Sequence, residues 1–152
     1  MNSKKSMDKN WERIGEVPVD SGQVMLVDPT YIDSNWQDKP FEDIRQYRHK
    51  ESGKVLQYRK DFPHYEAVIQ EFGQTMNQLN ATGEWDLLEQ PVPNELSYNA
   101  ACRATGQQAR GGAFGGLATA VGTAYGDGEY PVFVQRDEYG RILRVMIDFT
   151  EQ

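Results

Sequence analysis

The sequence predicts an α+β fold, in which an antiparallel sheet or sandwich packs against at least one helix. Three patterns support this fold class. Two β-like runs near the C-terminus flank a turn, another segment alternates between small and larger residues, and a middle segment has apolar residues every three to four positions. The first two patterns are typical of strands, and the third is typical of an amphipathic helix.

The C-terminal segment predicts a β-hairpin. Residues 130–136 and 141–149 flank the sequence Asp137-Glu138-Tyr139-Gly140, which suits a four-residue turn. Side chains alternate between the two faces of a strand, so the second run predicts one core-facing set of apolar residues. This set consists of Leu143, Val145, Ile147 and Phe149.

The clearest helix is predicted for residues 63–80. Six apolar residues share one helical stripe: Tyr65, Val68, Ile69, Phe72, Met76 and Leu79. Asp61 can cap the start, Pro63 suits the first turn, and residues 80–83 supply a stop. We therefore expect one face of this helix to pack in the core.

Shorter strands are expected elsewhere. Residues 11–27 predict two strands joined at Asp20-Ser21-Gly22, and further strands are expected at 55–59, 97–105 and 117–125. Residues 31–54 give no clear pattern, although a short helix face can be drawn through Phe41, Ile44, Tyr47 and Arg48. In 117–125 one face holds only Ala and Gly, so it forms a shallow trough. A neighbouring helix, another sheet or a ligand must approach that trough closely.

Length, charge and cysteine content limit the architecture and the partners. The 152 residues are expected to form a single domain over 11–152, preceded by a flexible tail, 1–10. The formal charge of −7 argues against long nucleic acids, which the average surface would repel. We expect a cytoplasmic protein without a membrane partner. The sequence has no signal peptide, no apolar stretch of about 20 residues, and a single cysteine, Cys102.

One window of the chain contrasts with its acidic average. Residues 96–125 contain no Asp or Glu but include Arg103 and Arg110. Eight of the chain's 14 glycines lie between residues 106 and 128. Glycine lets the main chain approach a ligand closely, and arginine offers a forked donor to phosphate or carboxylate. The window therefore predicts a site for a small anionic ligand.

The residues of this predicted site have distinct roles. Arg103 and Arg110 would bind phosphates, although each can also be a solvated surface charge or belong to an ion pair. Thr105 and the main-chain amides of Gly111 and Gly112 would donate hydrogen bonds. Three aromatic residues would offer stacking surfaces for bases: Tyr98, Phe114 and Tyr125.

Sequence patterns for catalysis and metal binding are missing. His49 and His64 belong to no ligand motif, and the alanines around Cys102 favour a buried structural thiol over a nucleophile. Residues 126–130 are explained by turn chemistry, and residues 111–116 lack the Lys-Ser/Thr ending of a phosphate-binding loop. We therefore expect no metal, no cofactor and no catalytic residue.

Three segments of the chain resemble a family of small, uncharacterised proteins common in bacteriophages and their hosts. They are 20–32 (DSGQV through VDPTYI), 97–105 (SYNAACRAT) and 126–134 (GDGEYPVFV), with its closing strand to Phe149. Members of this family often have a cysteine where this chain has Thr30. The chain also resembles, more weakly, the phage nucleotide sponges that counter CBASS immunity. That resemblance implies an oligomer that sequesters a cyclic dinucleotide such as 3′3′-cGAMP without cleaving it.

These observations lead to one main hypothesis and two alternatives. The main hypothesis is a phage-encoded, non-enzymatic protein that sequesters a cyclic oligonucleotide immune signal in the host cytoplasm. The first alternative is an acidic inhibitor of a host enzyme that acts through residues 1–60, with Tyr31, Trp36, Phe41 and Tyr47 on its active face. The second alternative is an enzyme that cleaves a nucleotide.

Binding energies predict self-association. Nanomolar affinity requires about −12 kcal/mol. Two arginine–phosphate contacts and two stacked bases supply that much or less before the costs of association are subtracted. A cyclic dinucleotide has approximate two-fold symmetry, so two copies of the chain can share one ligand. We therefore expect a homo-oligomer.

Overall fold

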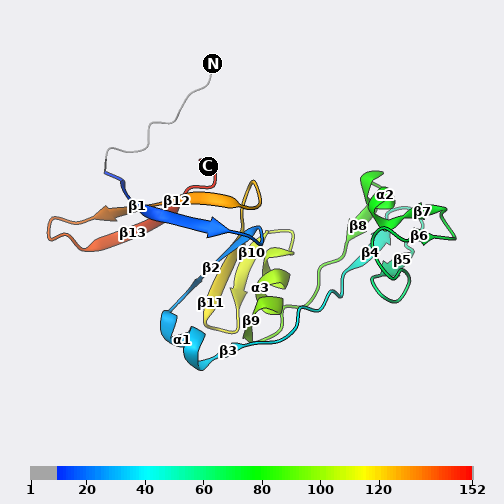
Figure 1. Cartoon of the computed structure of the whole chain (residues 1–152), viewed down its shortest axis with the longest axis horizontal. Coiled ribbons are helices and arrows are strands. Elements are labelled where there is room, and N and C mark those ends of the chain that lie inside the picture. The colour runs from blue at the N-terminus through cyan, green and yellow to red at the C-terminus, as the bar shows by residue number, and fades with distance from the viewer. Residues whose placement is uncertain (1–9, 152) are drawn as a thin grey trace, which may run out of the picture.

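The computed structural model describes residues 10–151 as a mostly antiparallel β structure with three short helices. The predicted tail, 1–10, lies outside these residues except for Asn10. Two parts can be followed in Figure 1: a main body that contains residues 12–37 and 96–147, and a small lobe that contains residues 46–87. A first connector, 38–45, and a second connector, 88–95, join them.

One three-stranded sheet of the main body contains the predicted C-terminal hairpin. Strands β1 (Glu12–Val19), β12 (Gly128–Arg136) and β13 (Ile142–Ile147) pair antiparallel in the order β1-β12-β13. The hairpin is confirmed, but only half of its predicted core face is. Ile147 and Phe149 pack against the cluster around Tyr130, whereas Leu143 is 61% and Val145 is 59% exposed. The sheet projects away from the rest of the main body (Figure 1), and its buried contacts gather at one end, around Tyr130.

A second three-stranded sheet lies beside the first. Strands β2 (Gln23–Val27), β10 (Gly111–Phe114) and β11 (Ala118–Gly122) pair antiparallel in the order β10-β11-β2. The two strands expected at 11–27 and the strand expected at 117–125 are therefore confirmed. The turn at residues 20–22 does not close a hairpin, because β1 and β2 belong to different sheets.

Helix α3 (Tyr98–Thr105) fills the predicted trough. Its buried face, Ala100, Ala101 and Ala104, shares a core cluster with Ala118 and Ala120 of β11. The small side chains on both elements let the helix approach the sheet closely. Of the alternatives left open by the sequence, the neighbouring helix is the one that the structure shows.

The prediction of a strand at 97–105 is wrong, and local signals explain why. The Ser97 hydroxyl caps the helix by accepting a hydrogen bond from Ala100 N at 3.1 Å. Alanine has the highest intrinsic helix propensity, and the segment contains three alanines after this cap. Gly106 then lies at the C-cap.

Two short elements complete the main body. Helix α1 (Pro29–Ser34) starts after Asp28, whose side chain accepts a hydrogen bond from Thr30 N at 2.9 Å. Strand β3 (Trp36–Gln37) pairs in parallel with β9 (Leu96–Ser97), which leads directly into α3. The first connector leaves the main body after β3, and the second connector returns to it at β9.

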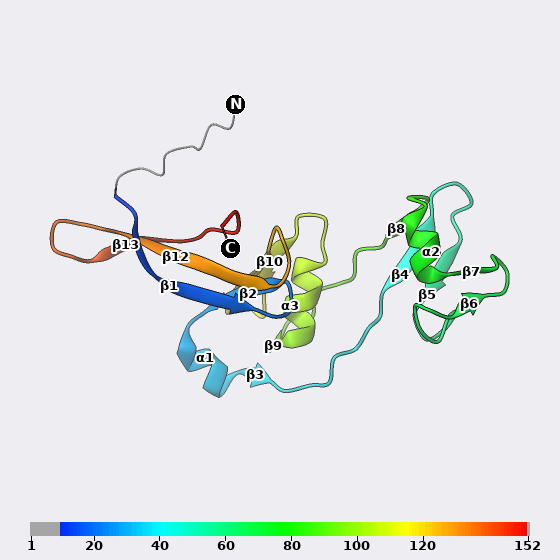
Figure 2. The same cartoon turned by 45° about the horizontal axis from the view of Figure 1, so that its top comes forward.

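The small lobe, which can be followed apart from the main body in Figure 2, contains strands β4 to β8 and helix α2. It has a hydrophobic core of its own. Strands β4 (Gln46–His49), β5 (Val55–Gln57) and β8 (Trp85–Leu87) form a sheet in the order β5-β4-β8, which confirms the strand expected at 55–59. Strands β6 (Val68–Ile69) and β7 (Gln74–Thr75) form a small hairpin, followed by helix α2 (Met76–Ala81). The buried residues of this core are Tyr47, Leu56, Phe62, Ile69, Met76, Leu79 and Trp85.

The prediction of a long helix at 63–80 is wrong, because only its last turns are helical. Gly73 adopts φ +63°, a left-handed conformation that ends the turn after Ile69 and prevents a continuous helix. Helix α2 begins instead at Met76, after the N-cap Thr75, which forms a capping box with Gln78. The short helix face drawn through 41–48 is also wrong, since residues 46–49 form β4.

Candidate functional site

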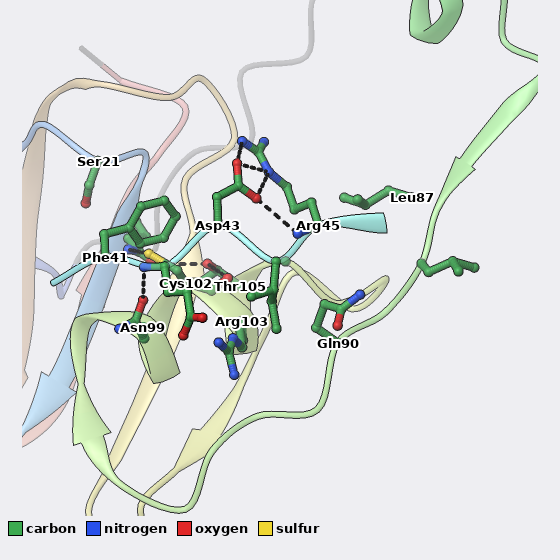
Figure 3. Close-up of a pocket in the computed structure, with 15 residues that line it drawn as sticks. Ser21, Phe41, Asp43, Arg45, Leu87, Gln90, Asn99, Cys102, Arg103 and Thr105 are labelled. Carbon is green, nitrogen blue, oxygen red and sulfur yellow. Dashed lines mark hydrogen bonds and ion pairs between the residues drawn. The ribbon is translucent and has the colours of Figure 1, made fainter. Parts of the chain in front are cut away.

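A pocket of about 330 Å³ lies beside α3, where both connectors pass over the helix (Figure 3). We call it the α3 pocket. Four segments contribute to its lining. They are the turn before β2 with the first residue of β2, the end of the first connector, the end of β8 with the start of the second connector, and α3 with its C-cap. The lining residues are Ser21, Gln23, Phe41 to Arg45, Leu87, Leu88, Gln90, Asn99, Cys102, Arg103, Thr105 and Gly106.

Asn99 attaches the first connector to α3. Its side-chain oxygen accepts a hydrogen bond from Glu42 N at 2.9 Å, and its side-chain nitrogen donates one to Pro40 O at 3.0 Å. The rings of Phe41 and Tyr98 pack edge to face, with centroids 5.7 Å apart. The wall that carries Phe41 is therefore fixed to the N-terminal half of the helix.

The second connector is attached to the turn that follows α3. The side-chain amide of Gln107 donates a hydrogen bond to Gln90 O at 2.7 Å, and Gln108 N donates one to Glu89 Oε1 at 2.7 Å. Both connectors are thus held by residues 98–108, so the pocket is built within one chain.

Gln23, the first residue of β2, lines the pocket and is hydrogen-bonded to α3. Its Oε1 accepts a hydrogen bond from the Thr105 hydroxyl at 2.8 Å, and its Nε2 donates to Cys102 Sγ at 3.3 Å. A hydrogen bond with the Cys102 thiol, together with burial, raises the pKa of Tyr98. The thiol and the Thr105 hydroxyl therefore already have partners within the fold.

On one side of the pocket, Asp43 and Arg45 form an ion pair. Arg45 binds Asp43 through two nitrogens, with Nη2–Oδ2 at 2.6 Å and Nε–Oδ1 at 3.0 Å, and the Tyr65 hydroxyl donates to Asp43 Oδ2 at 3.2 Å. Burial alone would raise the pKa of Asp43, but the hydrogen bonds from Arg45 and Tyr65 outweigh it and lower that pKa. Arg45 also lies over the Tyr65 ring at 4.8 Å. The Arg45 guanidinium is therefore already occupied by Asp43 and the Tyr65 ring.

Arg103 lies on the other side of the pocket (Figure 3) and differs from Arg45. It is half-buried, and within residues 10–151 its guanidinium has no hydrogen-bond or ion-pair partner. The pKa of Glu95 is lowered chiefly by Lys39, at 2.6 Å, and by Ser97, with a weaker contribution from Arg103. Of the two arginines that line the pocket, Arg45 and Arg103, only Arg103 has a guanidinium without such a partner among the described residues.

The structure does not bring all the predicted site residues together. Arg103 and Thr105 line the pocket, and Tyr98 packs against its wall through Phe41. Arg110 is exposed on a turn with φ +55° and does not line the pocket. Tyr125, in the turn after β11, is 68% exposed and does not line it either.

Phe114 and Gly111 of β10 serve packing, and neither they nor Gly112 line the pocket. Phe114 is only 3% exposed inside the α3 core, so its ring offers no face on which a base could stack. Gly111 and Gly112 pair with Val121 and Ala120 of β11. A Cβ at Gly111 would meet Ala120 O at 2.9 Å, so glycine is needed there for the close approach of the strands.

Sequence patterns did not identify Gln23, Phe41 and Asn99 as pocket residues. Asn99 carries the clearest signal in retrospect, because a polar amide among the alanines of a buried helix must find hydrogen-bond partners. The aromatic face expected on residues 1–60 is smaller than predicted. Tyr47 is buried in the small lobe, and Trp36 packs partly against the α3 core.

Within residues 10–151, no group of three His, Cys, Asp or Glu side chains is placed to hold a metal ion. In the same range, no helix has the length and apolar character needed to cross a bilayer. No protein-family model, curated protein or solved structure matches the chain. The function is therefore inferred from the pocket and the sequence.

Proposed function

We propose that this protein binds and sequesters a small anionic ligand with a planar base, of the cyclic-oligonucleotide class, and does not turn it over. The observation that carries the proposal is Arg103, a half-buried residue that lines a pocket and whose guanidinium has no hydrogen-bond or ion-pair partner within residues 10–151. An arginine fork binds phosphate through two parallel hydrogen bonds, and partial removal from water strengthens such contacts. A phosphate is therefore the group that this side chain fits best.

Other lining residues supply the contacts that a nucleotide needs. Phe41 is 55% exposed and borders the pocket, so its free ring face can stack on a base. Gln90 and Ser21 also line the pocket and offer polar side-chain atoms for the edge of the base or the sugar. Leu87 and Leu88 provide apolar contact.

The size of the pocket supports one nucleotide unit per chain. Its volume of about 330 Å³ lies at the low end of the range for ligand pockets, about 300–1,000 Å³. A cyclic dinucleotide would therefore be held by two chains, one base and one phosphate in each pocket. This arrangement agrees with the homo-oligomer that binding energies favour.

The protonation states in the pocket support binding over catalysis. A general acid or base works best with a pKa near the operating pH. The contact with Arg45 lowers the pKa of Asp43, which keeps that carboxylate ionised at neutral pH. Cys102 is engaged with Gln23 and Tyr98. Capture without cleavage would lower the free concentration of an immune signal in an infected cell, which is the role that the sequence resemblance implies.

Isothermal titration of the purified chain against cyclic di- and trinucleotides tests this proposal. We expect Arg103→Ala to weaken binding about 10- to 100-fold, because one charged hydrogen-bonded contact contributes about 1.5–3 kcal/mol. Arg110→Ala is the matched control, since that arginine is exposed outside the pocket, and its affinity should equal that of the wild type. Absence of heat with every nucleotide, for folded protein, contradicts the proposal.

Two further readouts separate the alternatives. Ligand recovered intact after denaturation of the protein supports sequestration, whereas hydrolysed ligand supports a nucleotide-cleaving enzyme. A stoichiometric host protein retained by the chain, together with no nucleotide binding, supports the inhibitor hypothesis.

A further inference from the structure

The two edges of the β1-β12-β13 sheet are protected to different degrees. Strand β1 has Glu12, Arg13, Glu16 and Pro18, and its pairing with β12 is interrupted by a bulge between Arg13 and Gly15. Charges, proline and bulges are the usual means by which proteins prevent pairing at an edge strand. Strand β13 (ILRVMI) also has a bulge, at Leu143, but it has one charged residue, Arg144, and no proline. Among residues 10–151, no strand pairs with the outer edge of β13.

The outer edge of β13 also exposes main-chain donors and acceptors. Asp148 N donates to Pro131 O at 3.1 Å, in continuation of the β12–β13 register. In an antiparallel pair the hydrogen-bonded positions alternate along each strand. Asp148 and Met146 therefore direct their main-chain groups toward β12, and Val145 and Ile147 direct theirs outward.

We propose that two copies of the chain associate through β13, antiparallel, about a two-fold axis at Met146. In this register Val145 of each copy faces Ile147 of the other, so their outward N–H and C=O groups form four hydrogen bonds across the axis. Their side chains lie on one face of the strand and meet across the axis. The product is a continuous six-stranded sheet.

Charge complementarity selects this register. Arg144 of each copy lies directly opposite Asp148 of the other, on the face opposite to Val145. Asp148 Oδ1 accepts hydrogen bonds from Thr150 N at 2.8 Å and Thr150 Oγ1 at 2.6 Å. Its Oδ2 has no partner among residues 10–151 and can accept from Arg144 of the second copy. An axis at Val145 would instead place Arg144 opposite Met146 and require the bulged residue Leu143 to pair.

Exposed apolar side chains also support self-association through this strand. Ile142, Leu143 and Val145 are 49%, 61% and 59% exposed. A second β13 would cover part of this surface, which a monomer leaves in water. Arg144 does not line the α3 pocket, so this inference stands independently of the proposed function.

Sedimentation equilibrium of the full chain tests the pairing. We expect a dimer of 17.3 kDa subunits. Arg144→Glu places a carboxylate opposite Asp148 and should raise the dimer dissociation constant at least tenfold, and Asp148→Arg should do the same. The double variant R144E/D148R restores opposite charges across the axis and should recover most of the wild-type affinity. Glu138→Lys, in the hairpin turn, is the control and should leave the constant unchanged.

A proline substitution provides a second test. Val145→Pro removes an outward N–H while the inward bonds to β12 remain, so it should abolish the dimer but retain the β circular-dichroism spectrum. A monomeric wild type, a dimer insensitive to Arg144→Glu, or a double variant that is no tighter than the single variants would each overturn the proposal. A failure here, with nucleotide binding retained, leaves the proposed function standing.

Discussion

The side-chain oxygen of Asn99 accepts a hydrogen bond from the main-chain nitrogen of Glu42 at 2.9 Å, and this bond links helix α3 to the first connector. Asn99 is only 7% exposed, and both ends of its amide are hydrogen-bonded to that connector. A buried amide of this kind is costly to leave unsatisfied. It therefore fixes the position of Phe41, whose ring borders the pocket.

Asn99→Ala should loosen the first connector. We expect a loss of about 1–3 kcal/mol in the free energy of unfolding, because two hydrogen bonds are removed and Pro40 O and Glu42 N lose their partner. Amide hydrogen exchange should accelerate in residues 41–45. Asn94→Ala, an exposed asparagine on the second connector, is the control. Equal exchange rates in the two variants would contradict this role of Asn99.

The contact between Asp43 and Arg45 should stabilise the protein only above the acidic range. The pKa of Asp43 is lowered in the folded state from an ordinary value of 3.8, so the folded state favours the ionised form. Its contribution is complete above pH 3.8 and is lost as the pH falls through the lower folded pKa. Urea unfolding should show Asp43→Asn less stable than wild type at pH 7, with a smaller difference near pH 3. A difference that stays constant with pH would contradict the assignment.

The contact of α3 with β11 predicts a face-dependent effect of added volume. Ala120 is fully buried under the helix, whereas Thr119, its neighbour, is exposed on the opposite face. Ala120→Leu should destabilise the protein by about 1–3 kcal/mol through overpacking. Thr119→Leu should change the stability by less than about 0.5 kcal/mol, as is usual for surface substitutions. Similar urea midpoints for the two variants would mean that α3 does not cover this face.

Two neighbouring glycines should respond differently to alanine. Gly115 and Gly116 have φ of +61° and +67°, so both substitutions carry the strain of a left-handed conformation. A Cβ at Gly115 would also lie 2.7 Å from the carbonyl carbon of Glu95, while none of the surrounding atoms lies within 4 Å of a Cβ at Gly116. Thermal unfolding should therefore show a larger loss for Gly115→Ala. The reverse order would contradict the packing of this turn against β9.

The sequence predicted the strands of the main body better than its helices. Alternation and turn residues identified β11 and the β12–β13 hairpin because such signals are local. The segment of α3 was interpreted as a strand, although Ser97 before an alanine-rich run and Gly106 after it are helix signals. The exposure of Val145 could not be predicted, because alternation shows that residues share a face but not whether another element covers it.

The small lobe shows a limit of periodicity. The stripe from Tyr65 to Leu79 fits a helix, and most of its members do contact one core. A hairpin followed by a short helix also buries them. Gly73 adopts φ +63°, which interrupts a continuous helix and favours the hairpin. Val68, a member of the stripe, is 62% exposed. The capping box from Thr75 to Gln78 was the local signal for the true helix start.

The candidate site was predicted in part. An acid-free window led to Arg103 and Thr105, which line the pocket. Long-range contacts supply the rest. Phe41 and Gln23 are 62 and 80 residues away from Arg103 in the sequence. The first connector brings Phe41 to α3, and the packing of α3 beside β2 brings Gln23 there. No local pattern could place Arg110 outside this pocket.

Nuclear magnetic resonance of the arginine side chains tests the central claim, that Arg103 is the phosphate-binding cation of the α3 pocket. The Nε–Hε signals of the ¹⁵N-labelled protein would be followed during titration with a cyclic dinucleotide and assigned through Arg103→Lys and Arg110→Lys. We predict a saturable shift of the Arg103 signal with no change at Arg110. A shift of Arg110 alone, or unchanged signals throughout the titration, would contradict the claim.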